Sequence, residues 1–234
     1  MVRIRPIAAE FVGSALLATI VIGSGIAAQQ LSRDAGLQLL ENALVTALGL
    51  PVLILVFAPV SGAHFNPVVT IVDALLGRRR WSDLAGYLPA QAVGCIAGAV
   101  LANAMFGMPA VTWSTTNRVT WPHLLAEVVA TAGLVLVIFA LARTGRSALV
   151  APAVGAYIGA AYFFTSSTSF ANPAITVGRM FSDTFAGIAP ASAPAYVAAQ
   201  LAGGLLGWLA VRAVFPAEPL SARAGSDAPR SAGA

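Results

Sequence analysis

The chain has 234 residues, of which 58% are hydrophobic and only 9% are charged, and its formal net charge is +4. This composition leaves too little polar surface to cover a water-soluble globule, which excludes a soluble enzyme or binding domain. All thirteen basic residues are arginines, and they flank apolar stretches without interleaved aromatics, so no nucleic-acid partner is expected. Most of the chain is therefore expected to be surrounded by lipid.

Six apolar segments are long enough to cross a membrane. Each has roughly 19 to 24 residues, and a helix of about 20 residues crosses a hydrocarbon core of about 30 Å. The predicted spans are 7–28, 39–60, 84–106, 121–142, 148–166 and 194–215. We expect an all-α polytopic membrane protein with a single domain over 1–215. The segment 216–234, rich in Ala, Ser, Gly and Pro, is expected to be a disordered cytoplasmic tail.

The arginines predict how the chain is oriented. If the N-terminus is inside the cell, only Arg33, Arg118 and Arg179 lie outside, and all the other arginines face the cytoplasm. This is the distribution that the positive-inside rule describes. We therefore expect a multi-pass protein of the inner membrane with both termini in the cytoplasm.

The two halves of the chain carry the same signals in the same order, which indicates an internal repeat. The matching signals are Ala9-Glu10 and Ala126-Glu127, Asn66-Pro67 and Asn172-Pro173, and the segments Tyr87 to Gly98 and Tyr196 to Gly207. Each repeat, about 5–107 and about 121–215, holds three spans, an odd number. The second repeat is therefore expected to be inverted in the membrane relative to the first.

Each repeat also contains an apolar segment that begins with Asn-Pro and is too short to cross the bilayer. Asparagine is a favoured helix N-cap and proline suits the first helical position, so both segments are predicted to be re-entrant half-helices. Two opposed helix N-termini, each with about half a positive charge, would exclude protons and cations but accept a neutral polar solute. We expect them to meet at Asn66 and Asn172 inside a pore.

Three motifs resemble the aquaporins and aquaglyceroporins: Ala-Glu-Phe at 9–11, Ser-Gly-Ala-His-Phe-Asn-Pro-Val at 61–68, and Phe-Ala-Asn-Pro-Ala at 170–174. The resemblance extends over roughly 5–215 and implies a homotetramer in which each protomer has its own pore. The residues that it assigns to the two pore motifs are Asn66, Pro67, Val68, Asn172, Pro173 and Ala174. Val68 stands where the family usually has alanine, a change expected to affect packing more than function.

The selectivity filter implied by the resemblance departs from the usual pattern. The family commonly has an arginine three residues after the second motif's asparagine, where this chain has Ile175. Counting from the motifs places the other filter positions at Thr46, Ala160 and Ser169. These residues imply a wide, weakly polar constriction, similar to that of family members that pass uncharged metalloid hydroxides.

Two alternatives concern the same region of the pore. A shift by one helical turn would bring Leu50, Tyr157 or Phe164 into the lumen and narrow it. Arg179 lies one turn beyond Ile175 and either supplies a positive charge to the outer vestibule or pairs with Asp183, four residues later.

Three further ionisable residues are candidates for roles near the pore. Glu10 and Glu127 lie within apolar spans, where an ionisable side chain is a functional candidate. The resemblance implies that they brace the loops 61–65 and 168–171, and the alternative is a proton relay. His64 either lines or gates the cytoplasmic vestibule or braces its loop.

The functional hypothesis is a passive channel for small uncharged solutes, namely water, glycerol-like polyols and metalloid hydroxides such as arsenous acid. The alternative is a proton-coupled secondary transporter, because inverted repeats with broken helices also form such proteins. Two histidines and one cysteine in separate segments offer no metal cluster, and no glycine-rich phosphate loop is present. No catalytic residue, cofactor or metal is expected, and the predicted partners are a small neutral solute and the lipid bilayer.

Overall fold

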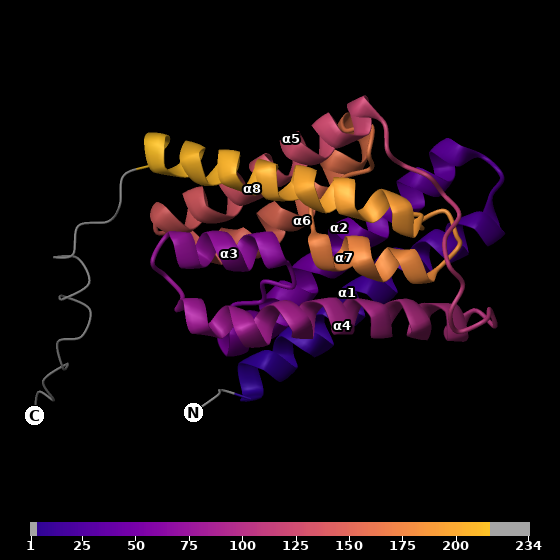
Figure 1. Cartoon of the computed structure of the whole chain (residues 1–234), viewed down its shortest axis with the longest axis horizontal. Helices are drawn as coiled ribbons and strands as arrows, with labels where there is room; N and C mark the ends of the chain where they lie inside the picture. Colours follow the sequence, from indigo (N-terminus) through magenta and orange to yellow (C-terminus); the bar gives the residue numbers. More distant parts are fainter. Residues whose placement is uncertain (1–3, 216–234) are drawn as a thin grey trace, which may run out of the picture.

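The computed structural model describes residues 4–215, which form a bundle of helices aligned with the long axis of the molecule (Figure 1). The α-helices are α1 (Ile4–Leu31), α2 (Ala35–Ser61), α3 (Pro67–Leu75), α4 (Trp81–Met105), α5 (Trp121–Arg143), α6 (Val150–Phe164), α7 (Pro173–Gly178) and α8 (Ala193–Val214). Short 3-10 turns lie at Ser147–Leu149, Arg179–Phe181 and Pro190–Ser192. The predicted tail, 216–234, is outside the described residues.

Six of these helices are long and apolar enough to cross a membrane: α1, α2, α4, α5, α6 with its preceding turn, and α8 with its preceding turn. The remaining two, α3 and α7, are the short helices that follow the two Asn-Pro pairs. They lie in line between α4 and α8, with their first residues toward each other (Figure 1). The predicted fold class, six transmembrane helices plus two half-helices, is confirmed.

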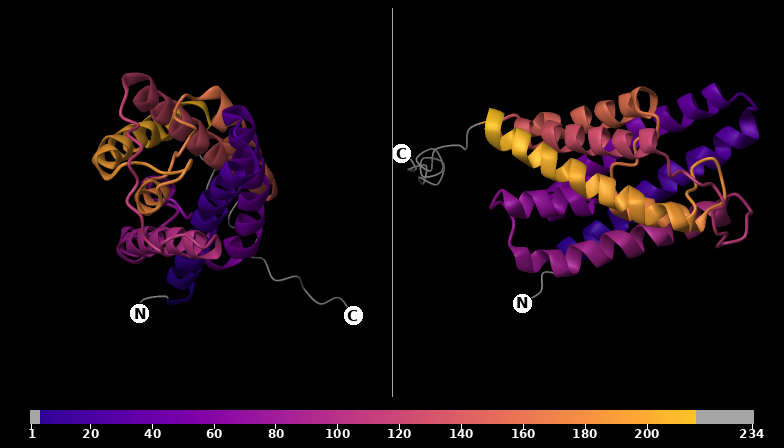
Figure 2. Two further views of the ribbon diagram at one scale, coloured as in Figure 1. Left: turned by 90° about the vertical axis from the view of Figure 1, so that its right-hand side faces the viewer. Right: turned by 45° about the horizontal axis from the view of Figure 1, so that its top comes forward.

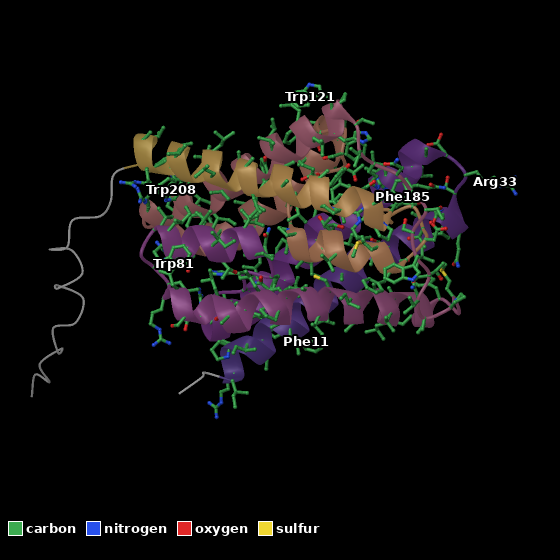
Figure 3. The ribbon with its side chains drawn as sticks, viewed as in Figure 1. Phe11, Arg33, Trp81, Trp121, Phe185 and Trp208 are labelled. Atoms are coloured by element: carbon green, nitrogen blue, oxygen red, sulfur yellow. The ribbon has the colours of Figure 1, made fainter. Side chains whose placement is uncertain are left out.

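The first described turn of α1 and the last turn of α8 lie at the same end of the bundle, which we call the termini end (Figure 2). The opposite end, called the loop end, carries Arg33 and Phe185 (Figure 3). Trp81 and Trp121, which begin α4 and α5, are exposed. Exposed tryptophans at helix ends are typical of the boundary between lipid and water.

Paired glycines allow the helices of each repeat to cross closely. A Cβ atom at Gly98 of α4 would stand 2.1 Å from the carbonyl oxygen of Ala15 on α1. The matching position in the second repeat is Gly207 of α8, where a Cβ atom would stand 2.7 Å from the carbonyl oxygen of Ala132 on α5. No side chain fits at either distance, so small residues let α1 approach α4 and α5 approach α8 through direct backbone packing.

Candidate functional site: the central pore

The two asparagines of the Asn-Pro pairs hold the half-helices together at the centre of the molecule. Asn66 accepts a hydrogen bond from the Val68 amide through Oδ1 at 2.9 Å and so caps α3. Its Nδ2 donates to the carbonyl oxygen of Ala171, in the loop before α7, at 2.8 Å. Asn66 therefore caps its own helix and also forms a hydrogen bond to the opposite repeat.

The second asparagine makes the reciprocal contacts. Asn172 accepts from the Ala174 amide at 2.9 Å, and its Nδ2 donates to the carbonyl oxygen of Phe65 at 2.8 Å. An amide nitrogen carries two hydrogens, so each asparagine keeps one further donor. Since both residues line the cavity described below, these donors are available to a solute.

The loop that leads into α3 is braced by Glu10 of α1, which is fully buried. Its carboxylate accepts from the Ser61 hydroxyl at 2.6 Å, the His64 amide at 3.0 Å, the Phe65 amide at 2.7 Å and the Gln91 side chain at 2.7 Å. Phe65 has a φ of 50°, in the left-handed region that non-glycine residues rarely adopt. The four hydrogen bonds fix this strained loop to α1.

Glu127 of α5 makes the equivalent set of contacts in the second repeat. It accepts from the Ser167 hydroxyl at 2.6 Å, the Phe170 and Ala171 amides at 2.9 Å, and the Gln200 side chain at 2.7 Å. Ala171 has a φ of 46°. The arrangement is that of a loop brace, and the occupied carboxylate oxygens argue against a proton relay.

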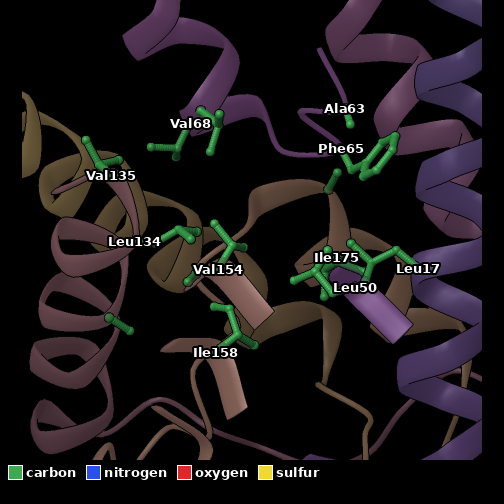
Figure 4. Packing of buried hydrophobic residues seen from close by; sticks show 14 of the residues in the cluster. Leu17, Leu50, Ala63, Phe65, Val68, Leu134, Val135, Val154, Ile158 and Ile175 are labelled. Carbon is green, nitrogen blue, oxygen red and sulfur yellow. The ribbon is translucent and has the colours of Figure 1, made fainter. Parts of the chain in front are cut away.

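A cavity of about 690 Å³ lies against both half-helices and against α1, α2, α5 and α6. Its lining includes Asn66 and Asn172 together with many apolar side chains. Leu50 of α2 and Ile175 of α7 belong to this apolar lining and to the buried cluster drawn in Figure 4. A lumen with a few polar groups in an apolar wall binds a polar solute weakly enough to let it leave.

Three of the four filter positions expected from the sequence line this cavity, namely Thr46, Ser169 and Ile175. The expectation for Ala160 needs correction, because this residue of α6 is exposed on the outside of the bundle. Tyr162, two residues later, lines the cavity, and its hydroxyl is 3.2 Å from that of Thr46. Residues two positions apart on a helix point about 200° away from each other. A residue count that is wrong by two therefore selects the opposite face of the helix.

The residues considered for a shift of one helical turn separate into two groups. Leu50 lines the cavity. Tyr157 instead donates to the carbonyl oxygen of Ala130 at 3.1 Å, and the side chain of Phe164 is exposed. Leu50 and Tyr162 are therefore the bulky side chains that α2 and α6 place at the cavity, whereas Tyr157 and Phe164 are not part of its lining.

Arg179 lines the cavity on the loop-end side of the half-helices and is buried. Its Nε donates to the carbonyl oxygen of Ala186, and its guanidinium carbon lies 3.4 Å from the centre of the Phe170 ring. The alternative pairing with Asp183 is wrong. That carboxylate accepts from the Thr115 amide at 2.9 Å and forms no ion pair with Arg179. The outer-vestibule position is the one that the contacts favour.

The termini-end mouth has a charged cluster that sequence reasoning missed. The carboxylate of Asp73 on α3 lies 3.3 Å from Nε of Arg78, 3.2 Å from Nε of Arg79 and 3.5 Å from Nε2 of His64. His64 also bonds to the Thr70 hydroxyl at 3.1 Å. The repeat could have revealed Asp73, because it follows Asn66 by seven residues, just as Arg179 follows Asn172.

Six apolar spans and two half-helices that meet at a polar centre beside a cavity define a membrane channel. No group of three or more His, Cys, Asp or Glu side chains suited to a metal ion occurs within residues 4–215.

The chain belongs to the major intrinsic protein family, whose model matches residues 1–170. It is 45% identical over 217 residues to aquaglyceroporin AqpS of Rhizobium meliloti (strain 1021), with 92% of this chain and 93% of that protein covered. It is 29% identical over 214 residues to the probable aquaporin TIP2-2 of Oryza sativa subsp. japonica, with 88% and 86% covered. The predicted family is confirmed, and because the family consists of channels the protein is a channel and not an enzyme.

A solved structure has the same fold. The aquaglyceroporin from Plasmodium falciparum superposes with a TM-score of 0.73, covering 89% of this chain and 95% of that one. The sequence identity is only 19%, so the likeness concerns the arrangement of helices alone.

Proposed function

We propose that the protein is a passive channel for small uncharged solutes, namely water and glycerol-like polyols. The observation that carries this proposal is the reciprocal pair Asn66 and Asn172, which presents two amide donors at the meeting point of the half-helices. Such donors orient the oxygen of a water or polyol molecule as it passes. The relative of 45% identity is named an aquaglyceroporin, which agrees with a polyol as solute.

The half-helices also suit the exclusion of protons and metal cations. The N-termini of α3 and α7 both face the centre of the cavity, and each has about half a positive charge. A cation at this point would be repelled from both sides, whereas a neutral solute would not. The proposal therefore includes cation and proton exclusion.

The constriction determines which neutral solutes pass. Thr46 and Tyr162 supply hydroxyl groups, Arg179 supplies a guanidinium, and Ile175 supplies an apolar surface. A wall with both polar and apolar groups suits small molecules that carry several hydroxyl groups. Glycerol-like polyols and uncharged metalloid hydroxides such as arsenous acid belong to this class, and we include both among the proposed solutes.

The proposal extends to the setting of the channel. The distribution of arginines supports an inner-membrane location with both termini in the cytoplasm. The termini end would then be cytoplasmic and the loop end external. The family resemblance supports a homotetramer with one pore in each protomer.

The proton-coupled transporter is less well supported. It requires a titratable pair that faces the solute, and Glu10 and Glu127 were its candidates. Each is fully buried, accepts four hydrogen bonds and is absent from the cavity lining. Uptake that depends on a pH gradient would nevertheless favour the transporter over the channel.

The test is stopped-flow light scattering on proteoliposomes, for water and for glycerol. We expect the wild-type protein to raise at least one of the two permeabilities above that of empty liposomes. Asn172→Ala should remove most of this increase, whereas Asn117→Ala, in an exposed loop outside the lumen, should preserve it. Permeabilities equal to those of empty liposomes, for water, glycerol and arsenous acid, would contradict the proposal.

A further inference from the structure

The loop end of the pore gathers positive charge around one aromatic ring, that of Phe170. The guanidinium carbon of Arg179 lies 3.4 Å from the ring centre, and that of Arg118 lies 5.4 Å from it. Neither arginine forms an ion pair with an acidic side chain of residues 4–215. The carboxylate bonded to the loop here is that of Glu127, so two guanidiniums face one carboxylate.

Backbone carbonyls occupy only part of the donor capacity of these arginines. Arg118 donates from Nε to Gly187 at 2.7 Å and from Nη2 to Phe185 at 2.9 Å. Arg179 donates from Nε to Ala186, and its side chain makes no further hydrogen bond within the described chain. Burial lowers the pKa of Arg118, a loop residue outside the spans, because a charge that is partly removed from water is destabilised. Its Nη1, and both terminal nitrogens of Arg179, remain available to an acceptor.

A third donor lies beside the same aromatic ring. The hydroxyl of Tyr196 is buried and has no hydrogen-bond partner among residues 4–215, and its ring packs against Phe170 with centres 5.1 Å apart. In the first repeat the equivalent Tyr87 donates to the carbonyl oxygen of Ser61 at 2.9 Å. The first repeat also has Asp73 as counter-ion for its arginines. Within residues 4–215 the second repeat has no acidic side chain in the place of Asp73 and no acceptor for the Tyr196 hydroxyl, and an unpaired buried donor is costly.

We propose that the loop end of the pore contains a binding site for one small monovalent oxyanion of the carboxylate or sulfonate class, held by Arg179, Arg118 and Tyr196 beside Phe170. An anion with several oxygens accepts hydrogen bonds from all three groups and supplies the missing negative charge. Because Arg179 and Phe170 line the cavity, the bound anion narrows the mouth and slows neutral solutes. The site is distinct from the asparagine pair, so it exists whichever neutral solute the channel carries.

The first experiment measures binding without transport. Methanesulfonate, a small anion at all working pH values, is titrated calorimetrically into the detergent-solubilised full chain. We expect saturable binding that Arg179→Gln weakens at least about tenfold, because a charge-assisted hydrogen bond is lost. Tyr196→Phe, which keeps the ring on Phe170, should weaken it by a smaller factor. Arg33→Gln removes the same charge from an exposed position at the same end and should leave binding unchanged.

Two results would overturn the proposal. An absence of heat in the wild type would mean that water alone satisfies these donors. An equal loss in Arg33→Gln and Arg179→Gln would mean unspecific attraction. If Arg179→Gln elutes as an aggregate, Arg179→Lys replaces it. That variant keeps the charge but loses the planar donor pair, and unweakened binding in it would contradict the assignment.

A second experiment tests the effect on flux. Wild-type proteoliposomes are compared in sodium methanesulfonate and in sodium gluconate, a much bulkier anion with a six-carbon chain, at equal ionic strength. Water or glycerol permeability should fall at least about twofold in methanesulfonate, and this difference should become smaller in Tyr196→Phe and disappear in Arg179→Gln. A protein that binds methanesulfonate but conducts nothing would contradict the proposed function and not the anion site.

Discussion

The two repeats share the centre of the pore and differ at its mouths. Glu10 and Glu127 brace their loops with matching sets of hydrogen bonds, and Asn66 and Asn172 exchange equivalent ones. Seven residues beyond each asparagine, the first repeat has Asp73, paired with arginines, and the second has Arg179, which has no acidic partner among residues 4–215. The shared residues hold the backbone in place, and the differing ones give each mouth its own charged groups.

The largest expected effect comes from breaking one brace. Glu127→Gln replaces a carboxylate oxygen that accepts hydrogen bonds with an amide that must donate, which leaves buried donors unpaired. We expect a loss of roughly 3 kcal/mol or more of stability. Thermal unfolding in detergent measures it. Glu10→Gln should cost a similar amount, and a cost near zero for either variant would mean that the loops hold their shape unaided.

The glycine crossings of the two repeats should differ in how much stability an added methyl group costs. Gly98→Ala would place a Cβ atom 2.1 Å from a carbonyl oxygen of α1, and Gly207→Ala would place one 2.7 Å from that of α5. Overpacking of this kind costs about 1–3 kcal/mol, so Gly98→Ala should be the worse of the two. Gly23→Ala is the control, because its nearest contact would be an ordinary 3.5 Å. Unfolding temperatures in the reverse order would contradict this account of the crossings.

The constriction can be tested at two neighbouring positions on α6. Tyr162→Ala should widen the lumen and raise the flux of a polyol larger than glycerol at least about twofold relative to glycerol. Ala160→Leu changes an exposed residue of the same helix and should leave this ratio unchanged. Stopped-flow measurements with glycerol and erythritol provide the ratio. A response to Ala160→Leu alone would restore the filter position expected from the sequence.

The smallest effect is expected at Asp183. Its carboxylate is exposed and bonds to Thr115, not to Arg179. Asp183→Asn should therefore change stability by no more than about 0.5 kcal/mol and leave permeability unaltered. A marked change of solute selectivity in this variant would show that Asp183 acts on Arg179 across the loop.

The sequence predicted the parts of the pore that the repeat marks twice. Six spans, two half-helices, Asn66 and Asn172 all follow from periodicity, capping preference and internal symmetry. The filter position on α6 did not, because a count across a loop cannot fix the rotation of the next helix, and Tyr162 was missed for Ala160. Asp73 was missed although the repeat marks its position, because its pairing with Arg78 and Arg79 depends on how the chain turns between α3 and α4.

The exchange of hydrogen bonds between Asn66 and Asn172 also has a consequence for the order of folding. Each asparagine donates to a carbonyl oxygen more than a hundred residues away, in the loop of the other repeat. While the first half of the chain is emerging from the ribosome, its re-entrant loop has neither its partner donor nor its partner acceptor. The first half can insert its three spans, but its half of the pore reaches its final form only after the second half has been made.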